Sequence, residues 1–191
     1  MTSKVNKKFA IISVSDKSNI DKIAKKLVKN KYQILSTGGT AKYLASKKVP
    51  TISISTFTGF NEILEGRVKT LHPKIHAGIL SKRNNNSHLK DLKKNNFEEI
   101  DLVVVNFYPF EKTLKSTNNH NKIIENIDVG GPAMVRAAAK NYNDVIVITK
   151  PKQYNELIKE LNSNNGSTSL DFRQKMSEEA FNETAYYDAL I

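Results

Sequence analysis

The sequence predicts an α/β fold with three layers, in which a mostly parallel sheet carries helices on both faces. Short runs rich in β-branched residues alternate with segments whose apolar residues recur at helical spacing, and this alternation is typical of parallel sheets with right-handed crossovers. The 191 residues suffice for one such domain and a tail. We expect the domain over residues 1–162 and a loop with a helical tail over 163–191.

Five short apolar runs bounded by turn residues predict the strands. They cover residues 9–14, 32–36, 51–55, 102–106 and 144–148. Residues 15–19 offer capping chemistry for a first helix from residue 20 to 28. Further helices are expected after the turn at 37–40, within the polar stretch at 82–96, up to residue 127, from 132 to 140, from 151 to 161 and over 170–191.

The segment from residue 56 to 73 differs from its surroundings. Glycines and a proline interrupt it, and Arg67, Lys69 and His72 fall within six positions. An irregular stretch of this length in a compact domain is usually functional or disordered. Its aromatic and aliphatic residues indicate that it is ordered.

Composition excludes several classes of protein. There is no cysteine, so disulfides and thiolate metal sites are excluded, and a reducing compartment fits. The polar start at residues 1–8 and the absence of long apolar runs predict neither a signal peptide nor a membrane partner. We therefore expect a cytoplasmic protein.

The formal net charge of +11 has three readings. It fits a nucleic-acid surface, whose phosphates favour clustered Lys and Arg. It also fits a pocket for a small phosphorylated anion, which a positive field helps to capture. The third reading is compositional, because many lysines fall on predicted helix exteriors. Charge alone does not decide between them.

Four polar loops are predicted to leave the carboxyl ends of strands, where open α/β sheets bind ligands. They begin at Ser15, Thr37, Thr56 and Asn106. The loop at 37–40 is either a structural turn or a phosphate cradle, in which glycines let backbone N–H groups approach an anion. It lacks the spacing of a Walker loop. Four loops on one rim indicate a binding site more strongly than any one of them.

Most of the polar residues on this rim also have a plain structural reading. Asp16 and Lys17 can form a solvated pair. Arg67 and Lys69 can be surface charges, although the planar fork of arginine suits phosphate or carboxylate. Asp128, before two glycines, can be a plain helix N-cap.

The remaining candidates also have structural alternatives. Tyr108 can belong to the core, and His72 can cap a helix. His72 and His76 have no nearby carboxylate partner in the sequence, which makes a poor metal site, so we predict none.

Seven segments, in order, resemble the amino-terminal half of the bifunctional purine-biosynthesis family AICAR transformylase/IMP cyclohydrolase. They are ISVSDK at 12–17, STGGTA at 36–41, GRVKTLHP at 66–73, HAGIL at 76–80, NFYPF at 106–110, ENIDVGG at 125–131 and RAAAKN at 136–141. Residues 180–188 match the end of that half. The resemblance thus covers nearly the whole chain but not the transformylase half, toward which residues 163–191 would lead.

The resemblance implies a methylglyoxal-synthase-like fold and the last step of de novo purine synthesis. In that step 5-formamido-imidazole-4-carboxamide ribotide closes its second ring to IMP and loses water. The implied partner is this small phosphorylated ribotide, with no nucleic acid. No cofactor is implied for ring closure, since 10-formyltetrahydrofolate serves only the transformylase half. A homodimer is possible, because the family forms one.

Carried over by position, the resemblance also implies site residues. The substrate-binding residues would be Ser15, Asp16, Lys17, Thr37, Gly38, Gly39, Thr40, Arg67, Val68, Thr70, Val105, Asn106 and Val129. Lys140 would have the acid/base role, with Lys69, Tyr108 and Asp128 near the reacting groups. Backbone N–H groups near Gly130 and Gly131, at a helix N-terminus, suit a developing oxyanion.

Asp128 and Lys140 are difficult to place at one site. They are twelve residues apart, and a straight helix between them spans about 15–18 Å. Both reach the reacting atoms only if the helix ends early or the Lys140 side chain reaches back. Physical reasoning favours Asp128, whereas the resemblance favours Lys140.

Two alternatives to an enzyme stay open. A non-catalytic module of the same fold that binds a phosphorylated effector would need the loop at 37–40, but not Lys69, Tyr108 and Asp128 together. A nucleic-acid-binding protein would need aromatics among exposed basic residues, whereas Phe107 and Phe110 lie beside a predicted core strand. The sequence is compatible both with a native chain and with a part of a bifunctional one.

Overall fold

The computed structural model describes residues 7–191, so residues 1–6 of the polar start lie outside the described part. Within this part, five strands form one sheet in the order β3-β2-β1-β4-β5, and all neighbouring strands run parallel. The strands are β1 (Lys8–Val14), β2 (Tyr32–Ser36), β3 (Ile52–Ser53), β4 (Leu102–Asn106) and β5 (Ile146–Ile148). The predicted α/β class and parallel sheet are confirmed.

The strand order places a topological switch point between β1 and β4. The chain builds from β1 outward to β3 and then returns to the other side of β1 for β4 and β5. In such sheets ligands bind beyond the carboxyl ends of the strands at this switch point. Both strands are continuous apolar runs, as expected where helices cover both faces.

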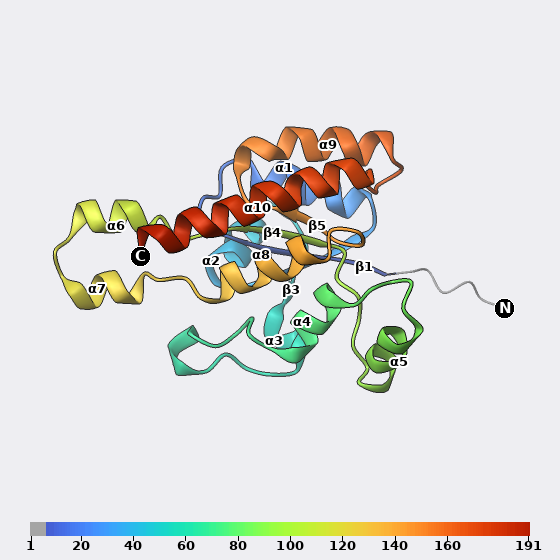
Figure 1. Ribbon diagram of the computed structural model, residues 1–191, viewed down its shortest axis with the longest axis horizontal. Coiled ribbons are helices and arrows are strands. Elements are labelled where there is room, and N and C mark those ends of the chain that lie inside the picture. Colours follow the sequence, from blue (N-terminus) through green and yellow to red (C-terminus); the bar gives the residue numbers. More distant parts are fainter. Residues whose placement is uncertain (1–6) are drawn as a thin grey trace.

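Helices flank the sheet in three layers (Figure 1). Helix α1 (Ile20–Lys29) packs on β2 and contacts α9 (Tyr154–Ser163), above the sheet in this view. Helix α8 (Gly130–Lys140) packs on β4 and β5 from the other side and contacts α4 (Pro73–Leu80). The other helical segments are α2 (Gly38–Ser46), α3 (Ile54–Thr58), η1 (Leu64–Gly66), α5 (Asn86–Lys94), α6 (Phe110–Ser116), α7 (His120–Glu125), η2 (Pro151–Gln153) and α10 (Leu170–Leu190).

Two local predictions were wrong. The third strand ends at Ser53, not at residue 55, because the Ser53 hydroxyl accepts the Thr56 N–H at 3.0 Å and starts α3. The capping chemistry predicted for α1 is also absent among these residues. Asn19 precedes α1 in a left-handed conformation (φ 58°) without a side-chain capping bond. Asp16 instead accepts the Ser18 N–H at 2.9 Å, within the loop.

Helix α10 lies along the β5 edge and contacts both β5 and α8 (Figure 1). Its Phe172, Met176 and Ala180 belong to the same apolar core as the sheet. The boundary predicted between 162 and 163 stays a prediction. Among residues 7–191, no helix combines the length and apolarity needed to cross a membrane.

Candidate functional site

A cavity of about 810 Å³ lies at the carboxyl ends of β1, β2 and β4. Most predicted site residues line it, namely Ser15, Lys17, Thr37, Gly38, Gly39, Thr40, Arg67, Lys69, Thr70, Asn106, Tyr108, Asp128, Val129 and Gly130. Asp16, Val68, Val105 and Lys140 are not among its lining residues. The prediction that several separate loops meet on one rim is confirmed.

One wall of the cavity is the amino-terminal turn of α2. Thr37 precedes the helix in an extended conformation, and its hydroxyl makes no capping bond to α2. Gly38 follows with a φ of +45°, a conformation that glycine adopts without strain. The Lys17 ammonium lies beside Gly39, 3.9 Å from where a Cβ would stand. Backbone N–H groups, a hydroxyl and a cation therefore converge where an anion can bind.

Behind this turn, Thr40 and Asn106 fasten the loops to the sheet. The Thr40 hydroxyl accepts the Val14 N–H at 3.1 Å and donates to the Val14 carbonyl at 3.0 Å. The side-chain oxygen Oδ1 of Asn106 accepts hydrogen bonds from the backbone N–H groups of Ser15 (2.7 Å) and Asp16 (2.9 Å). Both side chains line the cavity, but these polar atoms hold the loop after β1 in place.

Asp16 is exposed and turned to its own loop. Its carboxylate accepts the Ser18 N–H, and hydrogen bonding from Ser18 is the main cause that lowers its pKa. The Asp16 carbonyl oxygen accepts a hydrogen bond from the Asn106 amide at 3.0 Å. In this structure Asp16 shapes the loop and is not part of the cavity wall.

A second wall of the cavity carries two ion pairs, formed by Arg67 and Lys69. Arg67 contacts the Glu125 carboxylate through two nitrogens, with Nε 3.3 Å from Oε2. Lys69 Nζ lies 3.6 Å from the Glu62 carboxylate. Glu125 lines the cavity, and the sequence reasoning missed it as a functional residue. An available signal was its place in ENIDVGG, three residues before Asp128.

Asp128 lies between this wall and α8. Its Oδ1 accepts the Gly131 N–H at 2.9 Å, so the predicted capping role is confirmed. Burial raises the pKa of the Asp128 carboxyl, against the opposing effects of the Gly131 bond and the Lys69 charge. Gly130 permits close packing, because a Cβ there would stand 2.6 Å from the Thr70 hydroxyl. Gly131 lines the cavity next to Gly130.

Tyr108 follows β4 and is 52% exposed, so the alternative that placed it in the core is wrong. Tyr108 lines the cavity, as do Glu125 of α7 and Asp128. Lys69, Tyr108 and Asp128, three of the four predicted catalytic residues, thus share one cavity.

The fourth, Lys140, is exposed at the last turn of α8. Gly130–Lys140 forms a continuous helix, and its length of about 15 Å separates Lys140 from the cavity end. Val105 is buried in β4, and Val68 pairs through its backbone with Ile63. The role of Lys140 stays a prediction, and this geometry offers it no direct contact.

His72 lies near the end of the segment at 56–73, and His76 follows it. His72 Nδ1 accepts the Lys74 N–H at 3.1 Å and caps α4, which confirms the structural alternative. Burial lowers the pKa of His76. Residues 7–191 contain no group of three or more His, Asp or Glu side chains placed to hold a metal ion.

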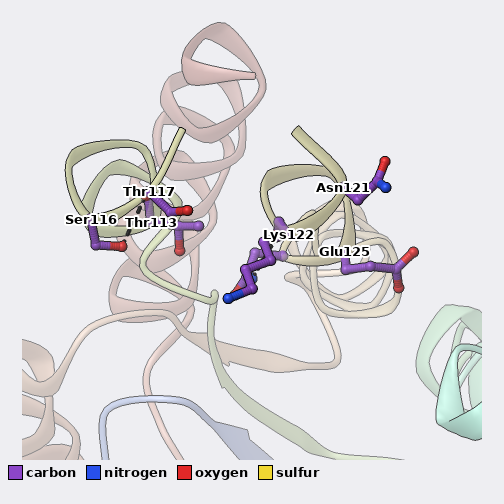
Figure 2. Close-up of a pocket in the computed structure, with 7 residues that line it drawn as sticks. Thr113, Ser116, Thr117, Asn121, Lys122 and Glu125 are labelled. Carbon is purple, nitrogen blue, oxygen red and sulfur yellow. Dashed lines mark hydrogen bonds between the residues drawn. The ribbon is translucent and has the colours of Figure 1, made fainter. Parts of the chain in front are cut away.

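A second cleft, of about 530 Å³, separates α6 from α7. Figure 2 shows Lys122 extending toward the gap while Asn121 and Glu125 point away from it. The side chains lining this cleft belong to the surface of the two helices. The cavity at the switch point is therefore the candidate active site.

Comparisons with known proteins show the family of the chain. The chain matches the family model of the MGS-like domain over residues 19–133 and that of the AICARFT/IMPCHase bienzyme over 138–191. It is 52% identical over 184 residues to the bifunctional purine biosynthesis protein PurH of Prochlorococcus marinus (strain MIT 9515), and 49% identical over 185 residues to that of Oenococcus oeni. Each alignment covers 96% of this chain.

The chain spans only 35% of the Prochlorococcus relative and 36% of the Oenococcus relative. The crystal structure of ForH has a TM-score of 0.86 and 32% sequence identity, and the alignment covers 96% of both chains. Fold and sequence agree, and the chain belongs to the MGS-like domain family, with a carboxy-terminal part that matches the AICARFT/IMPCHase bienzyme.

Proposed function

We propose that the chain is an IMP cyclohydrolase, which closes 5-formamido-imidazole-4-carboxamide ribotide to IMP and releases water. One observation carries the proposal. A single cavity joins an anion-binding helix N-terminus to a wall with Lys69, Tyr108 and Asp128. The names of the full-length relatives support the same pathway. The transformylase reaction is not part of the proposal, and a homodimer stays a prediction.

Binding would begin at α2. The ribotide phosphate fits the N–H groups of its first turn, with the Thr37 hydroxyl and Lys17 as further donors. With the phosphate held there, the base would extend across the cavity toward Lys69 and Asp128. Because nucleophile and electrophile belong to one molecule, fixing a near-attack conformation supplies much of the rate enhancement.

Ring closure then forms one C–N bond, breaks one C–O bond and removes one proton from each of the two nitrogens. The carboxamide nitrogen attacks the formyl carbon, and the Asp128 carboxylate accepts a proton from that nitrogen. Lys69 and the amino-terminal N–H groups of α8 stabilise the developing oxyanion. Tyr108 donates a proton to this oxygen, and the protonated Asp128 donates the second, so that the C–O bond breaks and water leaves. As the C=N double bond forms, the formamido nitrogen gives its proton to the Tyr108 phenolate, which restores both side chains. The raised pKa of Asp128 makes it a stronger base than an ordinary aspartate.

A spectrophotometric assay with the formylated ribotide tests the proposal. The wild-type chain should form IMP, and Lys69→Ala and Tyr108→Phe should each slow ring closure by about 100-fold or more, the usual contribution of an acid–base group. Lys25→Ala, an exposed lysine on α1, is the matched control. Folded protein that binds the ribotide without forming IMP would support the non-catalytic module and reject the enzyme.

A further inference from the structure

Helix α10 contacts β5 at the edge of the sheet and also contacts α8 and α6, which lie near the cavity. Its buried side chains recur at helical spacing and include Phe172, Met176, Ala180, Thr184 and Tyr187. The Ser177 hydroxyl donates to the Ala139 carbonyl at 2.7 Å, which fixes α10 against the end of α8. The 21 residues extend about 30 Å, and Figure 1 shows the last turns beside α6 and the start of α8.

Tyr187 is the last buried residue of this helix, and it contacts the backbone of Asp128 at the candidate active site. Its hydroxyl oxygen accepts the backbone N–H of Asp128 at 2.8 Å, across 59 residues of sequence. Its ring packs against Phe107, with centroids 4.9 Å apart, and against Phe110 at 6.3 Å. Tyr187 is 5% exposed, so both contacts are shielded from solvent.

These contacts surround two candidate catalytic residues without reaching the cavity. Tyr187 is not among the side chains that line it. Phe107 immediately precedes Tyr108. The N–H that Tyr187 binds is the backbone amide of Asp128, the residue that carries the candidate catalytic carboxyl. The carboxyl is therefore held at two points, by Gly131 through Oδ1 and by Tyr187 through the backbone.

We propose that Tyr187 is a positioning residue for ring closure, which fixes the direction of the Asp128 carboxyl and steadies Tyr108 through Phe107. The proposal rests on the cyclohydrolase function. Without the Tyr187 hydroxyl, the Gly131 bond still caps α8, but the Ile127–Asp128 peptide has lost its acceptor and can rotate. Misplacement of a reacting group by about 1 Å can cost about 100-fold in rate. Chemistry should suffer more than binding, because the phosphate cradle lies on other elements.

Tyr187→Phe tests the proposal, because it keeps the ring between Phe107 and Phe110 and removes only the acceptor. Tyr186→Phe is the matched control, since Tyr186 is the neighbouring and exposed residue of the same helix. Tyr187→Phe should lower kcat by about tenfold or more with KM within about twofold. Tyr186→Phe should keep both constants. Unchanged kcat in Tyr187→Phe, or equal losses in the two variants, would overturn the proposal.

A second readout does not depend on activity. The backbone amide of Asp128, followed by NMR, should shift and exchange faster with solvent in Tyr187→Phe than in the wild type. An unchanged Asp128 amide would overturn the positioning role, even if activity fell. If the wild type forms no IMP, the cyclohydrolase function fails, and the amide signal still shows whether Tyr187 holds Asp128.

Discussion

The two walls of the cavity are built in opposite ways. On the α2 wall, buried polar atoms are bonded to the backbone of the sheet, and Thr40 is only 4% exposed. On the second wall, Arg67 and Lys69 form ion pairs with glutamate side chains. The Arg67 and Glu125 side chains there are 63% and 59% exposed. One wall is fixed before any ligand arrives, whereas the other depends on contacts that water and salt can replace.

This difference suggests that the α2 wall binds the substrate and that the other wall takes part in the reaction. A preformed anion site suits phosphate, whose shape does not change during ring closure. Lys69 and Asp128 must respond as charge moves during the reaction, and both lie on or beside the exposed wall. The following substitutions test this division, from the largest expected effect on a wall to the smallest.

Thr40→Val should damage the fixed wall most. The substitution keeps the volume but leaves the buried N–H and carbonyl of Val14 without the Thr40 hydroxyl, at a cost of about 1–3 kcal/mol in the free energy of unfolding. Chemical denaturation measures this change. Thr37→Val is the matched control, because the Thr37 hydroxyl makes no capping bond. It should weaken ribotide binding while stability stays near wild type, and equal destabilisation by both variants would contradict a preformed wall.

Glu125→Gln should have a small effect on the exposed wall. An exposed ion pair contributes about 1 kcal/mol or less, so thermal unfolding should barely change. The substitution releases the Arg67 guanidinium, which can then bind an anionic ligand. We therefore expect KM for the ribotide to fall a few-fold. Glu111→Gln, which breaks an exposed pair with Lys115 on α6, is the control and should leave KM unchanged. A large rise in KM for Glu125→Gln would show instead that the pair is needed for binding.

Lys140→Ala should have the smallest effect. The side chain is exposed at the far end of α8, and we expect kcat and KM for IMP formation within about twofold of the wild type, because no direct contact with the reacting atoms exists to be lost. The same assay on Lys69→Ala should show a much larger loss of kcat. A comparable loss in Lys140→Ala would favour the role that the resemblance implies over the geometry.

Much of the fold follows from local patterns in the sequence. The apolar runs of β1, β2 and β4 predicted their strands well, because strands buried on both faces must be continuously apolar. The third strand was overestimated, since a single capping bond from Ser53 turned β-favouring residues into a helix. Local hydrogen bonds of this kind compete with strand propensity.

Cavity residues whose position follows from the strand topology were predicted, whereas contacts between residues far apart in the sequence were missed. Loops at the carboxyl ends of parallel strands had to converge, so Thr37 and Asn106 were found. The Arg67–Glu125 pair joins residues 58 apart, so the contact between them does not follow from either local segment. The Thr40–Val14 bonds likewise appear only when β1 and α2 are packed together.

Asp128→Asn tests the account most directly, through kcat for IMP formation at saturating ribotide, with the ribotide Kd and the free energy of unfolding measured alongside. Asparagine can still accept the Gly131 N–H, so α8 stays capped. Because the folded pKa of Asp128 is raised above the usual 3.8, wild-type stability falls as pH rises from that value toward the raised pKa, and the variant escapes this loss.

We predict that Asp128→Asn binds the ribotide, loses at least about 100-fold in kcat, and is no less stable than the wild type at neutral pH. A kcat close to that of the wild type would contradict the assignment of Asp128 as the base that closes the ring.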